Sequence, residues 1–373
     1  MNIRRLITKS LGGGLALLSF PLLVAAAPPD AAPEAPLFDI TVRRLSPRAA
    51  VFNGGNWDNA IVALATAKGI VVIDSGMSKS VARAFREAIR AEFRRNDFAM
   101  LINTHEHNDH ILGNSAYSDL PIVAHDSVRS AMLRLQADPN VLARLLEVPE
   151  KDEDGYRKYL LEHDPKVLET PNWARYQRFW KAVKADYRSG PDLAPPTITF
   201  DQRMTLHFGD VTVRLMYLGC THGIGAIVIH VPEENLVMTG GVFHPASQLP
   251  MLRAGDKPSE ALTPQLVNNW FAVLHDVLGA ADDKTRFIAC HGRQTANKAQ
   301  IQKLASYWEK LWTEVRRLKQ EGKTLEQANA ALSLKERFPE VADLSNDSLR
   351  GTIYEVLDIH RGNIEFMWKA LGQ

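Results

Sequence analysis

Three histidines and one aspartate crowd into seven consecutive residues, Thr104–His110. The segment reads His-x-His-x-Asp-His and comes directly after a short apolar run. Imidazoles packed this closely must be paired or bound to a metal when they are buried. Because alternate residues of a tight loop can face two directions, His105 and His107 can bind one metal ion while Asp109 and His110 bind a second. Imidazole nitrogen and carboxylate oxygen suit zinc, with iron or manganese less favoured.

The segments before this loop predict the elements that position it. Apolar runs rich in β-branched residues predict buried strands, namely Ile61–Leu64, Gly69–Ile73 and Met100–Ile102. The last of these delivers the chain into the histidine loop. Residues 78–93 predict a helix that Ser78 can cap, with apolar positions spaced by four at Val81, Phe85, Ile89 and Phe93.

Two helical regions enclose a second set of strands after the loop. Residues 127–196 are charged and aromatic and predict a helical insert. Its aromatic side chains form a lid over the substrate, the insert's own core or a dimer contact. Strand patterns resume at residue 197 and are clearest at 211–216, 226–231, 236–238 and 286–289. Residues 298–373 predict a C-terminal helical extension, in which Thr324 opens one helix with a capping box.

Residues 1–26 predict a signal peptide and not a part of the fold. Arg4, Arg5 and Lys9 form a positive region before the apolar run Leu11–Val24, and small residues follow at a plausible cleavage site. An uncleaved membrane anchor is the alternative. Residues 27–37 predict a disordered lead rich in proline and alanine. We therefore expect a periplasmic or secreted protein with no stable membrane span after signal cleavage.

The composition indicates which class of molecule the protein binds. Lys and Arg number 44 against 43 Asp and Glu, a net charge of +1 that argues against a dedicated nucleic-acid binder and leaves a small-molecule substrate as the expected partner. Two cysteines, Cys220 and Cys290, are too few for a disulfide scaffold. They are either small buried residues at strand ends, a disulfide pair or redox-sensitive thiols. The C-terminal helices are expected to pack on the core or against a second copy in a homodimer.

The histidine loop and its preceding strand resemble those of the metallo-β-lactamase superfamily, over roughly Phe38–Arg293 without the insert. The resemblance implies an α/β fold, an αββα sandwich spanning residues 38–297, to which the insert and the C-terminal helices are added. That family places a third histidine before a strand, which His222 matches here, although another register would put Cys220 in that position. Its last histidine follows a late strand in a P-G-H-G turn, which His291 matches.

The resemblance also implies a binuclear metal site with three protein ligands per metal, namely His105, His107 and His222 for the first and Asp109, His110 and His291 for the second. Most members bridge the two ions with an Asp in a T-G-D turn, but here Gly241 stands in its place and supplies no ligand. This set resembles the lactamase subclass without a bridging side chain, and it leaves occupancy of the second site open. His244 is either a substitute ligand, a pocket residue or a surface residue. Asp74 is expected to accept hydrogen bonds that stiffen the metal loop.

The activity that the resemblance implies is hydrolysis by a two-zinc enzyme. A metal-bound hydroxide would cleave an ester, thioester, lactone or amide bond, a β-lactam included, and Asp109 would orient the hydroxide and pass its proton to the leaving group. The alternative is a single-iron oxidoreductase of the persulfide-dioxygenase type, and a metal-free binding protein is a third class. The residues of the second site favour the hydrolase, because a single iron does not require them.

Overall fold

The computed structural model describes residues 36–55, 58–163, 166, 171–190, 192–219, 221–243, 263–342 and 356–372. The chain divides into the units Met1–Pro36 and Leu37–Gln373, and every described residue except Pro36 belongs to the second. The predicted signal peptide and residues 27–35 of the predicted lead lie outside the described residues. None of the described helices combines the length and the hydrophobicity that a membrane crossing requires.

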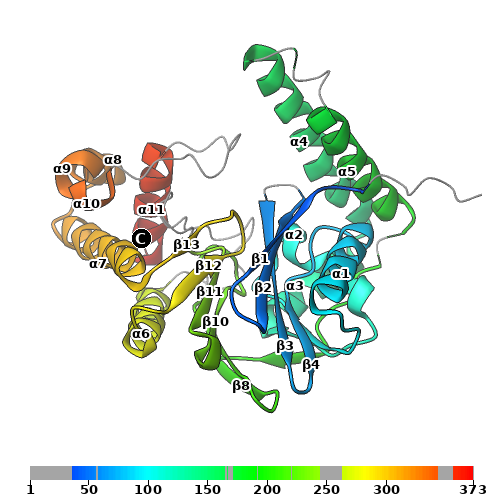
Figure 1. The fold of residues 1–373 in the computed structure, drawn as a ribbon. Helices are drawn as coiled ribbons and strands as arrows, with labels where there is room; N and C mark the ends of the chain where they lie inside the picture. The colour runs from blue at the N-terminus through cyan, green and yellow to red at the C-terminus, as the bar shows by residue number, and fades with distance from the viewer. Residues whose placement is uncertain are drawn as a thin grey trace, which may run out of the picture. The chain divides into compact units, whose positions relative to one another are not determined.

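The first sheet contains seven strands that follow one another in chain order, and its N-terminal strands lie side by side in Figure 1. They are β1 (Ile40–Arg44), β2 (Ala49–Gly54), β3 (Asn59–Thr66), β4 (Gly69–Ile73), β5 (Phe98–Ile102), β6 (Ile122–His125) and β7 (Ile198–Phe200). Pairing is antiparallel from β1 to β4 and parallel from β4 to β7. The segments that follow β4 and β5 therefore leave the sheet at the same edge.

The second sheet contains six strands in the order β13-β12-β11-β10-β9-β8. Their bounds are β8 (Arg203–His207), β9 (Thr212–Tyr217), β10 (Ile227–Val231), β11 (Leu236–Gly240), β12 (Arg286–Ala289) and β13 (Thr295–Ala296). Only β11 and β12 pair in parallel in this sheet. Their following segments also leave at one edge.

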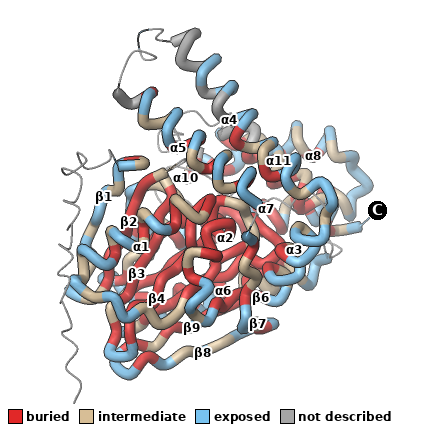
Figure 2. Tube along the Cα trace, turned by 90° about the vertical axis from the view of Figure 1, so that its right-hand side faces the viewer, coloured by how far each residue is buried: buried red, intermediate tan, exposed pale blue. Residues whose placement is uncertain are grey.

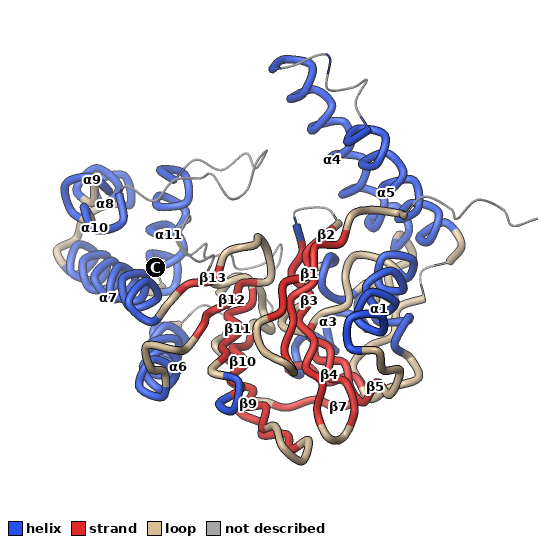
Figure 3. Tube along the Cα trace, in the orientation of Figure 1, coloured by secondary structure: helices blue, strands red, loops and turns tan. Residues whose placement is uncertain are grey.

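The two sheets pack face to face, and helices cover their outer faces (Figures 1 and 3). Val62 and Val71 of the first sheet share one buried cluster with Leu215 and Ile229 of the second. Strand β10 shows how alternation builds the layers, because Ile229 faces this central cluster whereas Val228 faces the helices beyond. Strands are buried along most of their length, while the helices keep an exposed outer side (Figure 2). The αββα sandwich predicted from the sequence is confirmed.

The helices fall into two sets by position in the chain. The first set consists of α1 (Lys79–Phe93), α2 (Asn108–Ile111), α3 (Asp126–Ala137), α4 (Val141–His163) and α5 (Pro171–Arg188). The second set consists of α6 (Pro264–Ala280), α7 (Lys298–Gln320), α8 (Leu325–Ala331), α9 (Leu334–Arg337), α10 (Pro339–Ala342) and α11 (Val356–Ala370). Short 3₁₀ helices lie at Asn114–Tyr117 and Pro232–Glu234.

Most predicted elements agree with these bounds. Helix α1 begins after Ser78, whose hydroxyl accepts a hydrogen bond from the Val81 amide as a cap, and Thr324 forms the predicted capping box of α8. Helix α6 was not anticipated, although Thr263 caps it and Val267, Trp270, Leu274 and Val277 recur at helical spacing on its buried face. Helices α6, α7 and α11 share one buried cluster with the second sheet, so the C-terminal helices pack on the core.

The predicted insert is helical, and its described aromatic residues face inward. Phe179 and Trp180 of α5 are buried in one cluster with Phe38 and with Phe85 of α1, and the Phe38 and Phe179 rings meet edge to face with centroids 5.6 Å apart. Tyr187 donates a hydrogen bond from its hydroxyl to the Met77 carbonyl at 2.7 Å. These side chains stabilise the packing of the insert on α1. The side chains of Tyr156 and Tyr159 lie outside the described part.

Candidate metal centre

The loop between β5 and α2 carries four of the predicted ligands. Strand β5 ends at Ile102, and α2 begins at Asn108, so His105 and His107 lie in the connecting loop while Asp109 and His110 lie in the first turn of the helix. His105, Asp109 and His110 are buried. The change from extended loop to helix turns the side chains in two directions, as the spacing of the motif predicts.

The first predicted group converges in space. Ligand atoms of His105, His107 and His222 all lie within 4.8 Å of one another, and His105 Nε2 lies 3.0 Å from His107 Nδ1. The His222 ring comes from the connection between β9 and β10, and its centroid lies 5.2 Å from that of His105 and 4.7 Å from that of His107. The structure therefore brings His222 to the place expected of the third histidine, while Cys220 lies outside the described residues.

The second predicted group also converges. Ligand atoms of Asp109, His110 and His291 lie within 4.8 Å of one another. Asp109 Oδ2 is 3.2 Å from Nε2 of His110 and 3.2 Å from Nε2 of His291, and these two nitrogens are themselves 3.2 Å apart. The two groups adjoin, because the ring centroids of His105 and His110 are 4.3 Å apart. Each group therefore gathers three donor atoms within 4.8 Å of one another. A tetrahedral metal site with one open position needs three protein donors.

The two groups differ in how they hold protons. Burial lowers the pKa of His105 well below its ordinary value, and the neighbouring imidazoles lower it further. Burial also opposes charge on Asp109 and His110, but their mutual attraction prevails: it holds the pKa of Asp109 well below its usual range and raises that of His110 well above it. Burial therefore favours a neutral His105, whereas the contacts within the second group favour a charged pair of Asp109 and His110.

Asp74 supports the metal loop from the end of β4. The Thr104 amide and hydroxyl donate hydrogen bonds to its carboxylate at 2.7 and 2.8 Å, and its Oδ2 lies 3.0 Å from His110 Nδ1. Since the Thr104 hydroxyl donates to Asp74, it accepts from Nδ1 of His105, 2.9 Å away, which leaves Nε2 of that ring as a lone-pair donor. Asp74 thus accepts hydrogen bonds that stiffen the metal loop, as expected from the sequence. Through Thr104 it also sets the tautomer of His105.

Two further residues at the centre were missed by the sequence analysis. The Asn59 amide donates to Asp109 Oδ2 at 3.0 Å and to its backbone carbonyl at 3.2 Å. The Glu106 carboxylate accepts from the backbone amides of Ile224 and Gly225 at 2.8 and 3.1 Å. Glu106 therefore ties the loop that carries His105 to the loop that carries His222. The position of Glu106 between His105 and His107 could have indicated a role at the centre. Its partner, the Ile224 amide, lies 118 residues away in the chain and could not be identified from the sequence.

We expect Glu106→Ala to lower zinc affinity of the first group by about 10–100-fold, the cost typical of losing an outer partner of a ligand. The Ile224 and Gly225 amides would lose their acceptor, and the His222 loop would no longer be held against His105. Titration of the apo-protein against a competing chelator measures this change. Glu87→Ala on α1, which breaks an exposed pair with Arg90, is the matched control, and equal affinities in the two variants would contradict the role of Glu106.

Gly241 is the position that the resemblance assigns to the family's bridging aspartate, and the structure shows what a side chain there would meet. A Cβ built on Gly241 would lie 2.2 Å from Cδ2 and 2.5 Å from Nε2 of His222. Contacts this short do not occur in folded proteins, so the imidazole of His222 fills the space that an aspartate would need. A side chain at this position would therefore require the His222 ring to shift. His244, the suggested substitute, lies outside the described residues.

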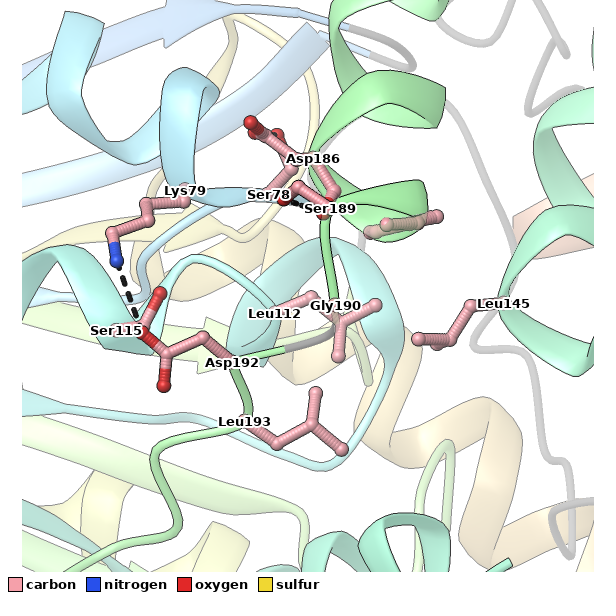
Figure 4. Close-up of a pocket in the computed structure, with 11 residues that line it drawn as sticks. Ser78, Lys79, Leu112, Ser115, Leu145, Asp186, Ser189, Gly190, Asp192 and Leu193 are labelled. Atoms are coloured by element: carbon pink, nitrogen blue, oxygen red, sulfur yellow. Dashed lines mark hydrogen bonds and ion pairs between the residues drawn. The ribbon is translucent and has the colours of Figure 1, made fainter. Parts of the chain in front are cut away.

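One cavity of about 260 Å³ lies near the metal loop but outside the centre. It opens among α1, α4, α5 and the segment after α2 (Figure 4), and Lys79 Nζ pairs with Asp192 Oδ2 at 3.0 Å along its wall. Its lining residues are Ser78, Lys79, Leu112, Ser115, Leu145, Asp186, Tyr187, Ser189, Gly190, Asp192 and Leu193. None of the six predicted ligands is among them. The cavity therefore belongs to the seam between the insert and α1.

Comparisons with solved structures find similar folds at low sequence identity. A metallo-beta-lactamase from Pontibacter korlensis shares 12% identity, with 72% of this chain and 99% of that chain covered and a TM-score of 0.46. The sec-alkylsulfatase Pisa1 from Pseudomonas sp. shares 12% identity, with 88% of this chain and 50% of that chain covered and a TM-score of 0.54. This chain thus spans about half the length of the sulfatase. At such identities the likeness concerns the fold alone.

Sequence comparison assigns the family. A comparison with curated proteins finds no match. The model of the metallo-beta-lactamase superfamily matches residues 55–291, more than half of the 373 residues. The match begins after β2 and ends at His291, so it includes all six predicted ligands and the strands from β3 to β12. The chain belongs to the metallo-beta-lactamase superfamily.

Proposed function

We propose that this protein is a zinc-dependent hydrolase of a small-molecule ester, thioester, lactone or amide, with a β-lactam among the candidates. The observation that carries the proposal is the convergence of six donor residues into two adjoining groups of three. Five imidazoles and one carboxylate, with no lysine among them, form a donor set suited to zinc. The signal peptide predicted for residues 1–26 supports an activity outside the cytoplasm.

Each of the six predicted ligands would have a defined role in such a site. His105, His107 and His222 would hold one ion, and His110 and His291 with Asp109 would hold the other. Zinc held there would supply Lewis acidity and an activated water for attack on a carbonyl or an equivalent centre. Asp109 Oδ2 lies 3.2 Å from a ring nitrogen of both histidines of the second group, so this carboxylate would be placed to orient a water molecule and to help pass its proton to the leaving group. Asn59 fixes the orientation of that carboxylate.

The proposal is tested by metal analysis of the purified mature protein together with a substrate panel. We expect about two zinc ions per chain and turnover of one class among nitrocefin, a thioester, a lactone, a phosphodiester and a secondary alkyl sulfate. Dialysis against a chelator should abolish this turnover, and zinc should restore it. One iron per chain with thiol-dependent oxygen uptake would instead support the persulfide-dioxygenase alternative, and a protein that retains and rebinds no metal would refute both.

A further inference from the structure

Cys290 is a buried thiol at the junction of the two metal-binding groups. It follows β12 and directly precedes His291, and it is free and buried. Its sulfur, a ring nitrogen of His105 and a ring nitrogen of His110 all lie within 4.8 Å of one another. His105 belongs to the first group of candidate ligands, and His110 belongs to the second. Cys290 is therefore a donor that reaches both groups at once.

The backbone holds this thiol beside the place of the missing bridge. The Cys290 amide donates a hydrogen bond to the Gly240 carbonyl at 3.0 Å, and its own carbonyl accepts one from the Ala60 amide at 2.8 Å. Cys290 is thus fixed from both sheets, next to the turn in which Gly241 cannot carry a side chain. The segment after β11 therefore brings no carboxylate to this region. The segment after β12 brings the sulfur of Cys290 close to His105 and His110.

We propose that the Cys290 thiolate is a seventh protein donor of the metal centre and binds in the bridging region, in place of the carboxylate that Gly241 lacks. The inference rests on the proposed zinc centre and adds a ligand to it. Zinc binds thiolate strongly, at about 2.3 Å against about 2.0–2.1 Å for imidazole nitrogen. On binding, the thiol proton is released to solvent, and the sulfur lone pair forms the bond to the metal without any change in oxidation state.

The competing explanation is that Cys290 is only a small residue that packs well at a strand end, as buried cysteines often do. The two explanations differ in what the sulfur touches once metal is present. A packing residue would leave the metal with nitrogen and oxygen ligands alone, and its replacement by serine would not change the ligand spectrum. A donor would place sulfur in the coordination sphere.

Cobalt substitution decides between them, because a thiolate bound to Co²⁺ produces an intense sulfur-to-metal charge-transfer band in the near ultraviolet. The chain has two cysteines, so Cys220→Ser is the matched control that leaves Cys290 as the single thiol. We expect the band in the wild type and in Cys220→Ser, and its loss in Cys290→Ser. X-ray absorption on the zinc form should show a sulfur shell near 2.3 Å in the same two proteins. Zinc affinity should fall at least about tenfold in Cys290→Ser.

The outcomes separate this inference from the function on which it rests. Two metals bound in Cys220→Ser without a sulfur band or shell would overturn the role of Cys290 and leave the hydrolase proposal intact. Failure of the wild type to bind any metal would overturn the proposed function itself. The decisive spectrum is that of Cys220→Ser, in which Cys290 is unchanged, so the test does not depend on how well Cys290→Ser folds.

Discussion

Asp109→Asn is expected to lower turnover of the best substrate by about 1,000-fold or more, within the range of about 10²–10⁴ that a positioned acid–base group supplies. Asparagine has nearly the same shape and can keep the contact with Asn59, but it carries no charge for a metal ion and cannot accept the proton of a water molecule. The retained metal should fall from about two ions per chain toward one. Steady-state kinetics and metal analysis of the same preparation measure both effects.

Asp119→Asn is the control for that substitution. Asp119 pairs with Arg86 at 2.6 Å on the surface, where an ion pair contributes at most about 1 kcal/mol to the free energy of unfolding. Its loss should leave turnover and metal content within about twofold of the wild type. Wild-type turnover in Asp109→Asn with full metal content would show that Asp109 takes no part in the chemistry.

The part of the centre that could be predicted from the sequence is the part whose residues are neighbours in the chain. His105, His107, Asp109 and His110 lie within six residues, so their type and spacing predict the site before any fold is known. His222 and His291 lie more than a hundred residues further along, and only a resemblance in strand order could place them. Their convergence depends on how two sheets pack, which no local pattern specifies.

The remaining features depend on contacts between distant segments. Glu106 is an unremarkable carboxylate in the sequence until the amides of Ile224 and Gly225 are brought to it. The sequence shows that Gly241 has no ligand to offer, but only the fold shows that the His222 ring occupies the space. Cys290 is next to His291 in the chain, yet its approach to His105 comes from packing one sheet on the other. Helix α6 had a helical pattern, which the sequence analysis did not use.

The edge at which the centre lies follows from the strand directions. Asp74 follows β4 and His105 follows β5, which are parallel neighbours in the first sheet. Gly241 follows β11 and Cys290 follows β12, which are parallel neighbours in the second. Parallel strands present their carboxyl ends together, and such ends are where open α/β sheets bind ligands. Each sheet thus contributes one pair of segments to the centre, and the sandwich brings the two pairs together.

Gly241→Asp, which restores the residue typical of the family, is expected to damage the centre and not to complete it. The new Cβ would lie 2.2 Å from the His222 ring, so the ring must move away from His105 and His107. We expect the loss of about one metal ion per chain and a fall in turnover of at least about 100-fold, with about 1–3 kcal/mol lost from the free energy of unfolding through overpacking. Metal analysis and thermal unfolding measure these effects.

Two alanine variants separate bulk from charge in this prediction. Gly241→Ala adds the same Cβ without a carboxylate and should lose the first metal as well, because the clash with His222 is steric. Gly279→Ala in α6, where nothing lies within 4 Å of an added Cβ, should leave metal content unchanged. If Gly241→Asp instead bound both ions more tightly than the wild type, the prediction would be wrong. The His222 loop would then be able to shift, and an aspartate could be accommodated at position 241. Full loss of the first metal in both Gly241 variants would show that the His222 ring needs the space beside Gly241 in order to bind metal.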